Sequence, residues 1–267
     1  MALIYNATFD KNTRKLSFED RAGSEIYSFT VPERGPTVDD LTKPLTFRAT
    51  QDGSTVGLYV SGNSYDYFQT SRDGGNTWTN YTFDTAITLN TGDEVSFRVK
   101  NDRTERQDRY NYIYFEMTGK IEAWHNVMSL WRTNDFATYE YVMVHAFYNL
   151  FKGCTSLVKA PALPATILTD YCYNHMFEGC QSLTKAPALP ATKLYGYCYA
   201  GMFSGCQSLK EVRISATKDA SFALINWLSG VSETGDFYCD PNATIFPKDE
   251  SGIPRNWTRH NIADYPN

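Results

Sequence analysis

The stretch that decides the fold begins at Gly153 with GCTSLVKAPALPATILTDYCYNHMFE and returns at Gly179 as GCQSLTKAPALPATKLYGYCYAGMFS. A third copy opens at Gly205 with GCQSLKEV, so the Gly-Cys pair recurs every twenty-six positions. A fixed period of this size predicts a solenoid, because one repeat cannot bury its apolar face alone and must stack on its neighbours. We therefore expect the rest of the chain to cap or carry this stack.

The first half of each repeat predicts one short strand. Leu157, Ala160 and Leu163 lie close together and are interrupted by Pro161, and the next repeat keeps the same order. Proline lacks a backbone donor and pushes the residue before it to extended angles, so a helix is excluded there. We expect the leucines that open successive repeats to stack on one another.

The second half of each repeat predicts a short helix. Cys172, Met176 and Phe177 follow an i, i+4, i+5 spacing, which places them on one face of a helical turn. Gly179 comes directly after this segment, where a left-handed residue often ends a helix.

The GCxSL opening, the LPAT segment and the YCYxxMFxGC ending together resemble the BspA-like branch of the leucine-rich repeats. The resemblance covers residues 142–212 and includes a degenerate unit in which Ala146 stands where Cys172 and Cys198 stand. The period of this chain is longer than the usual unit of that family. The branch is common on surface proteins of gut and oral bacteria and in their phages. The resemblance implies a leucine-rich-repeat solenoid with a strand and a helix in each coil, and a role in adhesion.

Composition and charge narrow the classes of function. The chain has 267 residues, of which 42% are apolar and 21% charged, as in a soluble globular protein of about two domains. A net charge of −5, without a cluster of Lys and Arg, argues against a nucleic-acid partner. The apolar run at the N-terminus is too short for a signal peptide, and no stretch approaches the ~20 apolar residues of a spanning helix. We therefore expect no membrane span.

Residues 1–43 differ from the repeats in charge and predict an N-terminal arm and linker. They hold thirteen charged residues, whereas the fifty-two residues of the two full repeats hold five. Short strands are expected at 3–9 and 15–18 around a turn at Lys11 and Asn12, followed by a proline-broken linker. Two interpretations stand side by side: an edge hairpin on the next domain, or an arm that anchors the protein to a partner.

Residues 44–120 predict an antiparallel β domain. About seven short segments rich in Thr, Val, Tyr and Phe are separated by turn signals, which favours a small sandwich of immunoglobulin-like type. The Cys and Trp landmarks of antibody domains are missing.

Within this domain, SRDGGNTW at residues 71–78 is similar to the Asp-box of sialidases. In such a hairpin Asp73 holds backbone donors, Gly74 and Gly75 adopt positive φ, and Trp78 packs beneath. The motif is structural, and a propeller needs several blades, so a single copy disfavours a sialidase.

Residues 121–235 are expected to form the leucine-rich-repeat solenoid with its N-terminal cap, and residues 236–267 its C-terminal cap. Apolar residues at a roughly helical spacing predict a helical N-terminal cap. They are Ile121, Trp124, Val127, Met128 and Trp131. The segment from Ala220 to Leu228 predicts a last amphipathic helix. The expected fold class is therefore mainly β, with a sandwich followed by a short capped solenoid.

The six cysteines predict two columns of small buried side chains, with Cys239 unassigned. One column holds Cys154, Cys180 and Cys206, and the other holds Cys172 and Cys198. Disulfides between Cys172 and Cys180 or between Cys198 and Cys206, or a bound metal, are the alternatives. The spacing between cysteines fits no usual zinc site, and Ala146 shows that a plain small residue suffices. We favour free thiols and expect no metal.

Catalytic patterns are sparse. The histidines lie in different segments, and only His175 shares a repeat with a cysteine, Cys172. A nucleophile pair needs a base within hydrogen-bond reach and a third group to orient it, and Gly201 takes the matching place in the next repeat. We expect no enzyme, no catalytic residue and no cofactor.

Tyrosines provide the candidate ligand contacts. Five of the 19 tyrosines recur beside the cysteine columns: Tyr171, Tyr173, Tyr195, Tyr197 and Tyr199. Tyrosine offers broad contact area at small entropic cost, which suits sugar rings and protein surfaces. The alternative is that these rings pack between coils.

Together these features favour a non-enzymatic phage virion structural protein, a capsid decoration or a tail or head fibre component. We expect it to be an oligomer on the virion surface, joined to other virion proteins through residues 1–43. Its repeats would bind a host-surface glycan or protein for adhesion. The alternative is a bacterial cell-surface or extracellular adhesin, or a carbohydrate-binding protein.

Overall fold

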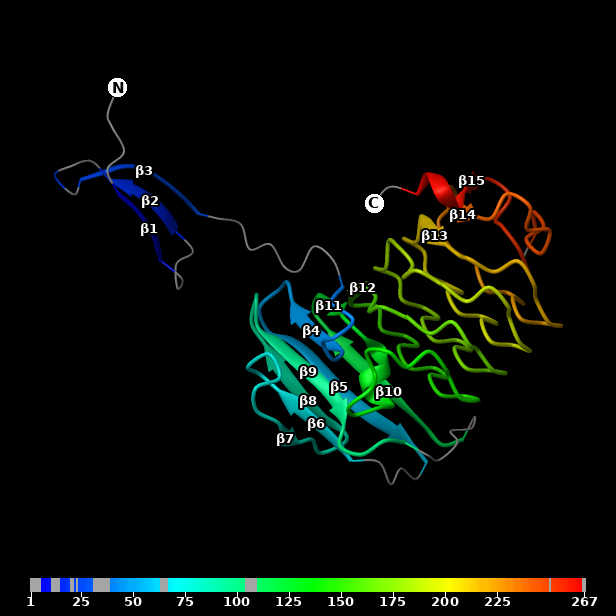
Figure 1. The fold of residues 1–267 in the computed structure, drawn as a ribbon, viewed down its shortest axis with the longest axis horizontal. Coiled ribbons are helices and arrows are strands. Elements are labelled where there is room, and N and C mark those ends of the chain that lie inside the picture. The colour runs from blue at the N-terminus through cyan, green and yellow to red at the C-terminus, as the bar shows by residue number, and fades with distance from the viewer. Residues whose placement is uncertain are drawn as a thin grey trace. The chain divides into compact units, whose positions relative to one another are not determined.

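The structure, a computed structural model, describes residues 6–10, 15–19, 22, 24–30, 39–62, 67–103, 110–249 and 251–265. It divides into two compact units, Met1–Val38 and Asp39–Asn267. The described residues form strands in several sheets and two short 3-10 helices, with no α-helix among them (Figure 1). The prediction of a mainly β fold is confirmed.

The first unit is a three-stranded antiparallel sheet. Its strands are β1 (Asn6–Asp10), β2 (Lys15–Glu19) and β3 (Glu25–Thr30), in the order β1-β2-β3. The predicted turn at residues 11–12 and most of the predicted linker lie outside the described residues. Among the described strands, β1 to β3 pair with one another. The edge hairpin and the anchoring arm both stay predictions.

The second unit begins with two sheets that share a core. One has the order β10-β5-β8, and the other has the order β12-β11-β4-β9-β6-β7. The first comprises β5 (Ser54–Ser61), β8 (Thr85–Leu89) and β10 (Tyr112–Thr118). The second comprises β4 (Thr46–Ala49), β6 (Phe68–Ser71), β7 (Thr79–Asn80), β9 (Glu94–Val99), β11 (Ile121–Trp124) and β12 (Leu157–Lys159).

Aromatic side chains join these two sheets. The Phe115 ring of β10 lies 4.7 Å from the Phe47 ring of β4 and 5.3 Å from the Phe97 ring of β9, measured between centroids. All three side chains are fully buried. Along β10, buried and outward residues alternate, which is the pattern that predicts a strand there.

The predicted N-terminal helix is wrong. Residues 121–124 form β11, which pairs antiparallel with β4 and parallel with β12, so one sheet runs from the β domain into the repeats (Figure 1). Only Val127–Leu130 is helical, as one 3-10 turn, η1, which begins after Asn126. The apolar spacing was misleading because Ile121 and Ala123 alternate as a strand while Val127 and Met128 are buried in the turn.

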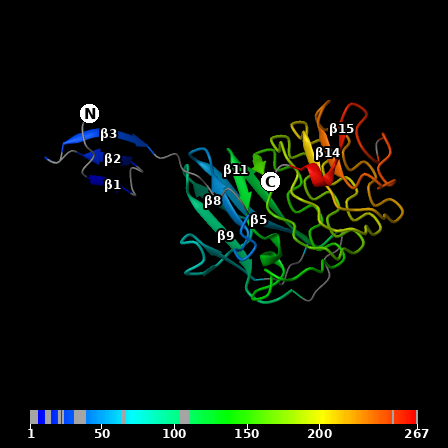
Figure 2. The same ribbon diagram turned by 45° about the horizontal axis from the view of Figure 1, so that its top comes forward.

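The repeats lie side by side in register, as both views show (Figures 1 and 2). Backbone N–H groups donate to the next repeat: Tyr173 to Cys198 O at 3.0 Å, and Phe177 to Met202 O at 2.9 Å. The Phe177 ring is stacked between Phe151, at 5.3 Å, and Phe203, at 5.5 Å. The leucines that open the repeats, Leu157, Leu183 and Leu209, are fully buried, as expected.

The helix predicted in each repeat is also wrong. Residues that do not donate to the next repeat donate three residues back, as Met176 N does to Tyr173 O at 3.2 Å. Every fourth residue is left-handed, with φ of 58° at Tyr171, 53° at His175 and 75° at Gly179. Overlapping tight turns of this kind repeat every four residues and so reproduce the apolar spacing of a helix.

The same backbone continues through the segment predicted as a last helix. Residues 221–228 are turns, and Phe222 and Asn226 are left-handed, with φ of 63° and 54°. They add a fourth unit to the stack. Because no described coil contains a helix, the prediction of a leucine-rich-repeat solenoid built from a strand and a helix per coil is wrong.

A parallel sheet closes the chain. It comprises β13 (Glu211–Arg213), β14 (Asp236–Cys239) and β15 (Thr258–Asn261), and the 3-10 turn η2 (Ile262–Asp264) follows it. The buried Trp227 indole donates to Gly252 O at 2.9 Å and packs 5.9 Å from the Phe237 ring. Residues 39–267 thus form one compact unit, and the boundaries expected at 120 and 235 stay predictions.

Candidate functional site

Four left-handed aromatic residues form a ladder on the repeats, which we name the aromatic column. Its members are His145, Tyr171, Tyr197 and Phe222, with φ of 58°, 58°, 56° and 63°. Neighbouring ring centroids are 4.9, 4.7 and 5.2 Å apart, and the rings lie within 18° of parallel. The side chains are half-buried, except that Phe222 is 58% exposed.

Two further columns share this left-handed backbone but not its side chains. The mixed column holds Asn149, His175, Gly201 and Asn226, and the glycine column holds Gly153, Gly179, Gly205 and Gly230. Glycine and asparagine tolerate positive φ best, whereas a bulky residue there costs on the order of 1–3 kcal/mol. Stacking stabilises the fold by about 0.5–1.5 kcal/mol per pair of rings. The backbone alone therefore does not require aromatic residues in this column.

A pocket of about 540 Å³ opens beside the aromatic column. It is lined by Tyr110, His145, Tyr148, Tyr171, Asn174, His175 and Tyr197. The Asn174 side chain is 5% exposed, and its amide nitrogen donates to Tyr197 O at 3.2 Å. Within the described part of the chain, neither the Tyr171 nor the Tyr197 hydroxyl has a protein hydrogen-bond partner. The pocket therefore combines ring surface with polar groups that can still bond.

The charged groups beside the pocket are paired with one another. The Glu178 Oε2 atom lies 2.6 Å from His175 Nδ1 and 2.8 Å from Lys152 Nζ. The His175 ring reaches across the next repeat because residue 201 is glycine, where a Cβ would lie 2.3 Å from the ring. The result is a surface with polar groups but little uncompensated charge.

The structure divides the five predicted tyrosines into two groups. Tyr171 and Tyr197 line the pocket, and Tyr195 is half-buried beneath the Lys193 ammonium. Tyr173 and Tyr199 are 1% exposed and stack 5.9 Å apart inside the repeats, where burial raises the pKa of both phenols. They are core residues, because residues two apart in these turns point to opposite sides. The packing interpretation thus holds for Tyr173 and Tyr199, and ligand contact at Tyr171, Tyr195 and Tyr197 stays a prediction.

Five other pocket residues were not predicted as ligand contacts: Tyr110, His145, Tyr148, Asn174 and His175. His145 stands one repeat period before Tyr171, in the first, degenerate unit, and this period was the signal that could have found it. Tyr110 lies outside the repeated pattern, and Tyr148 stands where the next repeats have Asn174 and Ala200, so no recurring tyrosine marked either of them.

The buried cysteines form the columns expected of them. The thiols of Cys180 and Cys206 each donate at 3.1 Å to a phenylalanine carbonyl of the preceding repeat, Phe151 O and Phe177 O. Burial raises the pKa of Cys206 to about 12 and that of Cys198 to about 12 as well. A nucleophilic cysteine needs a lowered pKa and access, and these thiols have neither.

The paired residues Cys172 and His175 do not form a nucleophile and base. Cys172 is fully buried, and burial raises the pKa of its thiol well above the ordinary value. The His175 imidazole is half-buried and pairs with Glu178. His145 lines the same pocket as His175, while the other two histidines lie elsewhere. His260 Nε2 contacts Asp236 Oδ1 at 2.7 Å, and His125 Nδ1 accepts from Asp40 N at 3.1 Å.

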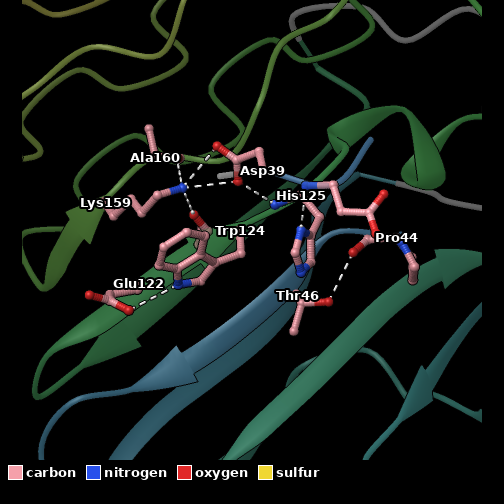
Figure 3. A network of polar contacts seen from close by, with 10 residues as sticks. Asp39, Pro44, Thr46, Glu122, Trp124, His125, Lys159 and Ala160 are labelled. Atoms are coloured by element: carbon pink, nitrogen blue, oxygen red, sulfur yellow. Dashed lines mark hydrogen bonds and ion pairs between the residues drawn. The ribbon is translucent and has the colours of Figure 1, made fainter. Parts of the chain in front are cut away.

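A second polar cluster ties the start of this unit to the sheet (Figure 3). Lys159 Nζ lies 3.0 Å from both Asp39 carboxylate oxygens and 3.7 Å from the Trp124 ring centroid. Asp39 Oδ1 also accepts from His125 N at 2.8 Å, and Trp124 Nε1 donates to Glu122 Oε2 at 2.9 Å. Burial lowers the pKa of Lys159 and of His125. These groups bond to one another, so the cluster fixes the chain where it enters β4.

The Asp-box segment behaves as a structural hairpin. The Asp73 carboxylate accepts from Ser71 Oγ at 2.7 Å and from Thr77 N at 2.9 Å, and these bonds lower its pKa to about 2. Gly74 and Gly75 have φ of 71° and 94°, as expected.

Neither a metal site nor a membrane span is found in the described ranges. No three His, Cys, Asp or Glu side chains of those ranges are grouped so that they could hold a metal ion. No helix in the same ranges has the length and apolar character needed to cross a membrane.

No protein-family model matches the chain, and neither a curated protein nor a solved structure shows significant similarity to it. The BspA-like resemblance rested on short motifs whose expected helix is absent from every described repeat. The assignment to that family of leucine-rich repeats is therefore wrong.

Proposed function

We propose that this chain is a non-enzymatic recognition protein that binds a glycan at the aromatic column and the pocket beside it. The observation that carries the proposal is the side-chain choice at the left-handed positions. His145, Tyr171 and Tyr197 place rings beside a pocket at positions where glycine or asparagine would hold the same backbone at lower cost. Strain retained next to a pocket is a reason to infer function there.

The chemistry of the pocket favours a sugar over other small ligands. A sugar ring presents C–H faces and edges that pack on aromatic surface, and hydroxyls that need hydrogen-bond partners. The pocket offers both, through ring surface and through the Tyr171 and Tyr197 hydroxyls and the His175 imidazole. Apolar lining with a few placed polar groups is typical of ligand sites.

Binding is tested by affinity electrophoresis in gels that contain neutral polysaccharides, and by a glycan array. The wild-type protein is expected to bind at least one neutral glycan. Tyr197→Asn keeps the left-handed backbone and removes a ring, so the affinity should fall by about tenfold, since a lost stack of about 1 kcal/mol approaches that factor. Tyr141→Asn, which replaces a repeat tyrosine outside the pocket, is the matched control and should bind like wild type. Absence of glycan binding by the wild-type protein contradicts the proposal.

For the biological setting we keep the virion as the proposal, with display as a decoration or fibre component. Two features support it: residues 1–38 form a unit of their own, and a recognition site of modest size gains avidity when an oligomeric particle displays many copies. A bacterial surface adhesin is the alternative.

Deletion of residues 1–38 separates these settings. The cut keeps Asp39, whose carboxylate pairs with Lys159, so the remaining unit should fold and still bind glycan. The truncated protein is expected to fail to join the phage particle. If the full chain does not associate with particles, the adhesin alternative is favoured. If the truncated chain joins particles equally well, residues 1–38 are not the segment that attaches the protein.

A further inference from the structure

The rings of the aromatic column continue onto the β domain. From His145 the path passes to Tyr148 at 5.9 Å, to Tyr112 at 5.2 Å and to Tyr114 at 6.0 Å between centroids. Tyr59 ends it, stacked 5.7 Å from Tyr114. We name these eight rings, from Tyr59 to Phe222, the aromatic stripe. Its steps of 4.7–6.0 Å contain no gap between the two parts of the unit.

The strands of the β domain present this end of the stripe outward. Along β10, Ile113 and Phe115 are buried while Tyr112 and Tyr114 are half-buried on the opposite face. Tyr59 of β5 is the register partner of Tyr114, so the two rings share that face. Residue 57 is glycine, and a Cβ there would lie 2.8 Å from the Tyr59 ring. Gly57 therefore lets this ring lie across β5, as Gly201 does for His175.

A second pocket lies at this end of the stripe. It has a volume of about 340 Å³, and Thr55, Tyr59, Tyr114, Glu116, Thr118 and Lys152 contribute to its lining. Lys152 of this pocket and His175 of the first pocket contact the same Glu178 oxygen, at 2.8 and 2.6 Å. The Glu178 carboxylate therefore pairs with one lining residue of each pocket.

We propose that the two pockets and the stripe form a single extended site for a linear, neutral polysaccharide. This inference rests on the proposed function and specifies its ligand. A linear polymer fits because ring surface runs without a gap from one pocket to the other, whereas one sugar would use one pocket. A neutral polymer fits because Lys152, Glu178 and His175 compensate one another. Glu116 and the net charge of −5 disfavour an acidic chain.

The test compares ligand length in the full chain. Amylose, mixed-linkage β-glucan, xylan and mannan, each with its tri- and hexasaccharide, serve as probes, and polygalacturonate serves as the acidic comparison. For the neutral glycan that binds, the polymer should bind about tenfold tighter than the trisaccharide, because each further stacked ring contributes. Titration calorimetry gives the affinities.

Variants at the two ends of the stripe locate the length effect. Tyr114→Ser should abolish most of the gain with length and leave the trisaccharide affinity unchanged, while Tyr114→Phe keeps the ring and should restore the gain. Tyr67→Ser, at an exposed tyrosine of the β domain outside the stripe, is the control. Tyr197→Asn should weaken all lengths.

Each failure has a separate meaning. If Tyr114→Ser leaves polymer affinity unchanged while Tyr197→Asn lowers it, the extended site is wrong and the proposed function stands. Equal affinity for trisaccharide and polymer has the same meaning. Binding confined to polygalacturonate overturns the neutral ligand, and binding to no glycan, or only to a protein, overturns both proposals.

Discussion

The β domain and the repeat stack satisfy their backbone groups in different ways. In the β domain, β5 pairs with β10 and β8 in regular antiparallel register, and buried and outward residues alternate along β10. In the repeats, donors such as Tyr173 N reach a carbonyl of the next repeat, Cys198 O, and left-handed residues turn the chain between such donors. In the second arrangement each residue has a counterpart in the next repeat, so a change at one position acts on a whole column.

A charge in the leucine column should therefore have the largest effect. Leu183 is fully buried between repeats, and Leu183→Asp places an unpaired carboxylate there, at a cost of several kcal/mol that is comparable with the stability of a domain. We expect the variant to be unfolded by circular dichroism. Thr184→Asp, at the exposed neighbouring position, should be folded and keep the denaturation midpoint of the wild type. A folded Leu183→Asp with an unchanged denaturation midpoint would contradict the stacking register.

Loss of the ion pair between Asp39 and Lys159 should have the second-largest effect on stability. Asp39→Asn leaves the partly buried Lys159 ammonium without its carboxylate, and we expect the unfolding free energy to fall by about 1–2 kcal/mol. The double variant with Lys159→Met should recover part of that loss, since no buried charge remains unpaired. Urea denaturation of the wild type, Asp39→Asn, Lys159→Met and the double variant measures the coupling energy between the two side chains. If the loss of unfolding free energy in the double variant equals the sum of the losses in the two single variants, the ion pair contributes nothing to stability.

A left-handed glycine tests whether the two regions respond alike to backbone strain. Gly205→Ala, in the glycine column, and Gly53→Ala, in a turn of the β domain, both require an alanine at positive φ, with glycine φ of 74° and 71°. Each should cost about 1 kcal/mol, because a Cβ at Gly205 would meet its nearest neighbour at an ordinary 3.6 Å and one at Gly53 would point into open space. A much larger loss at Gly205 would show that the column is packed more tightly than the structure indicates.

The smallest expected effect lies in the Asp-box hairpin. The pKa of Asp73 is lowered to about 2 from 3.8, so its contribution is present above pH 3.8 and is lost as the pH falls through 2. The carboxylate is exposed, so the effect is small. Melting temperatures of wild type and Asp73→Asn should differ slightly at pH 6 and converge near pH 2. A difference that persists at pH 2 would assign the effect to something other than the carboxylate.

The strands of the β domain and the period of the repeats could be predicted from the sequence. The helix predicted in each repeat was wrong. Alternation around residues such as Phe115 identifies a strand whatever its neighbours are. The spacing of Cys172 and Met176 is shared by a helix and by overlapping turns with a left-handed residue every fourth position. Only the positive φ at Tyr171 and His175 distinguishes them, and a tyrosine gives little warning of positive φ.

The candidate site was predictable in part for a related reason. The period of the repeats marked Tyr171 and Tyr197, and the same period extended backward marks His145. The period could not separate these from the buried Tyr173 and Tyr199, because that depends on which side of the turns each residue faces. The continuation of the stripe to Tyr59 depends on tertiary contacts with β10, which leave no periodic signal in the sequence.

The central claim is that the aromatic column is kept for binding rather than for the backbone. The double variant Tyr171→Asn/Tyr197→Asn tests it when unfolding free energy and glycan affinity are measured on the same sample. Relief of strain at two left-handed positions offsets the lost stacking, so stability should stay within about 1 kcal/mol of wild type while glycan binding is lost. A loss of several kcal/mol in stability, with glycan affinity retained by the folded fraction, would contradict the claim.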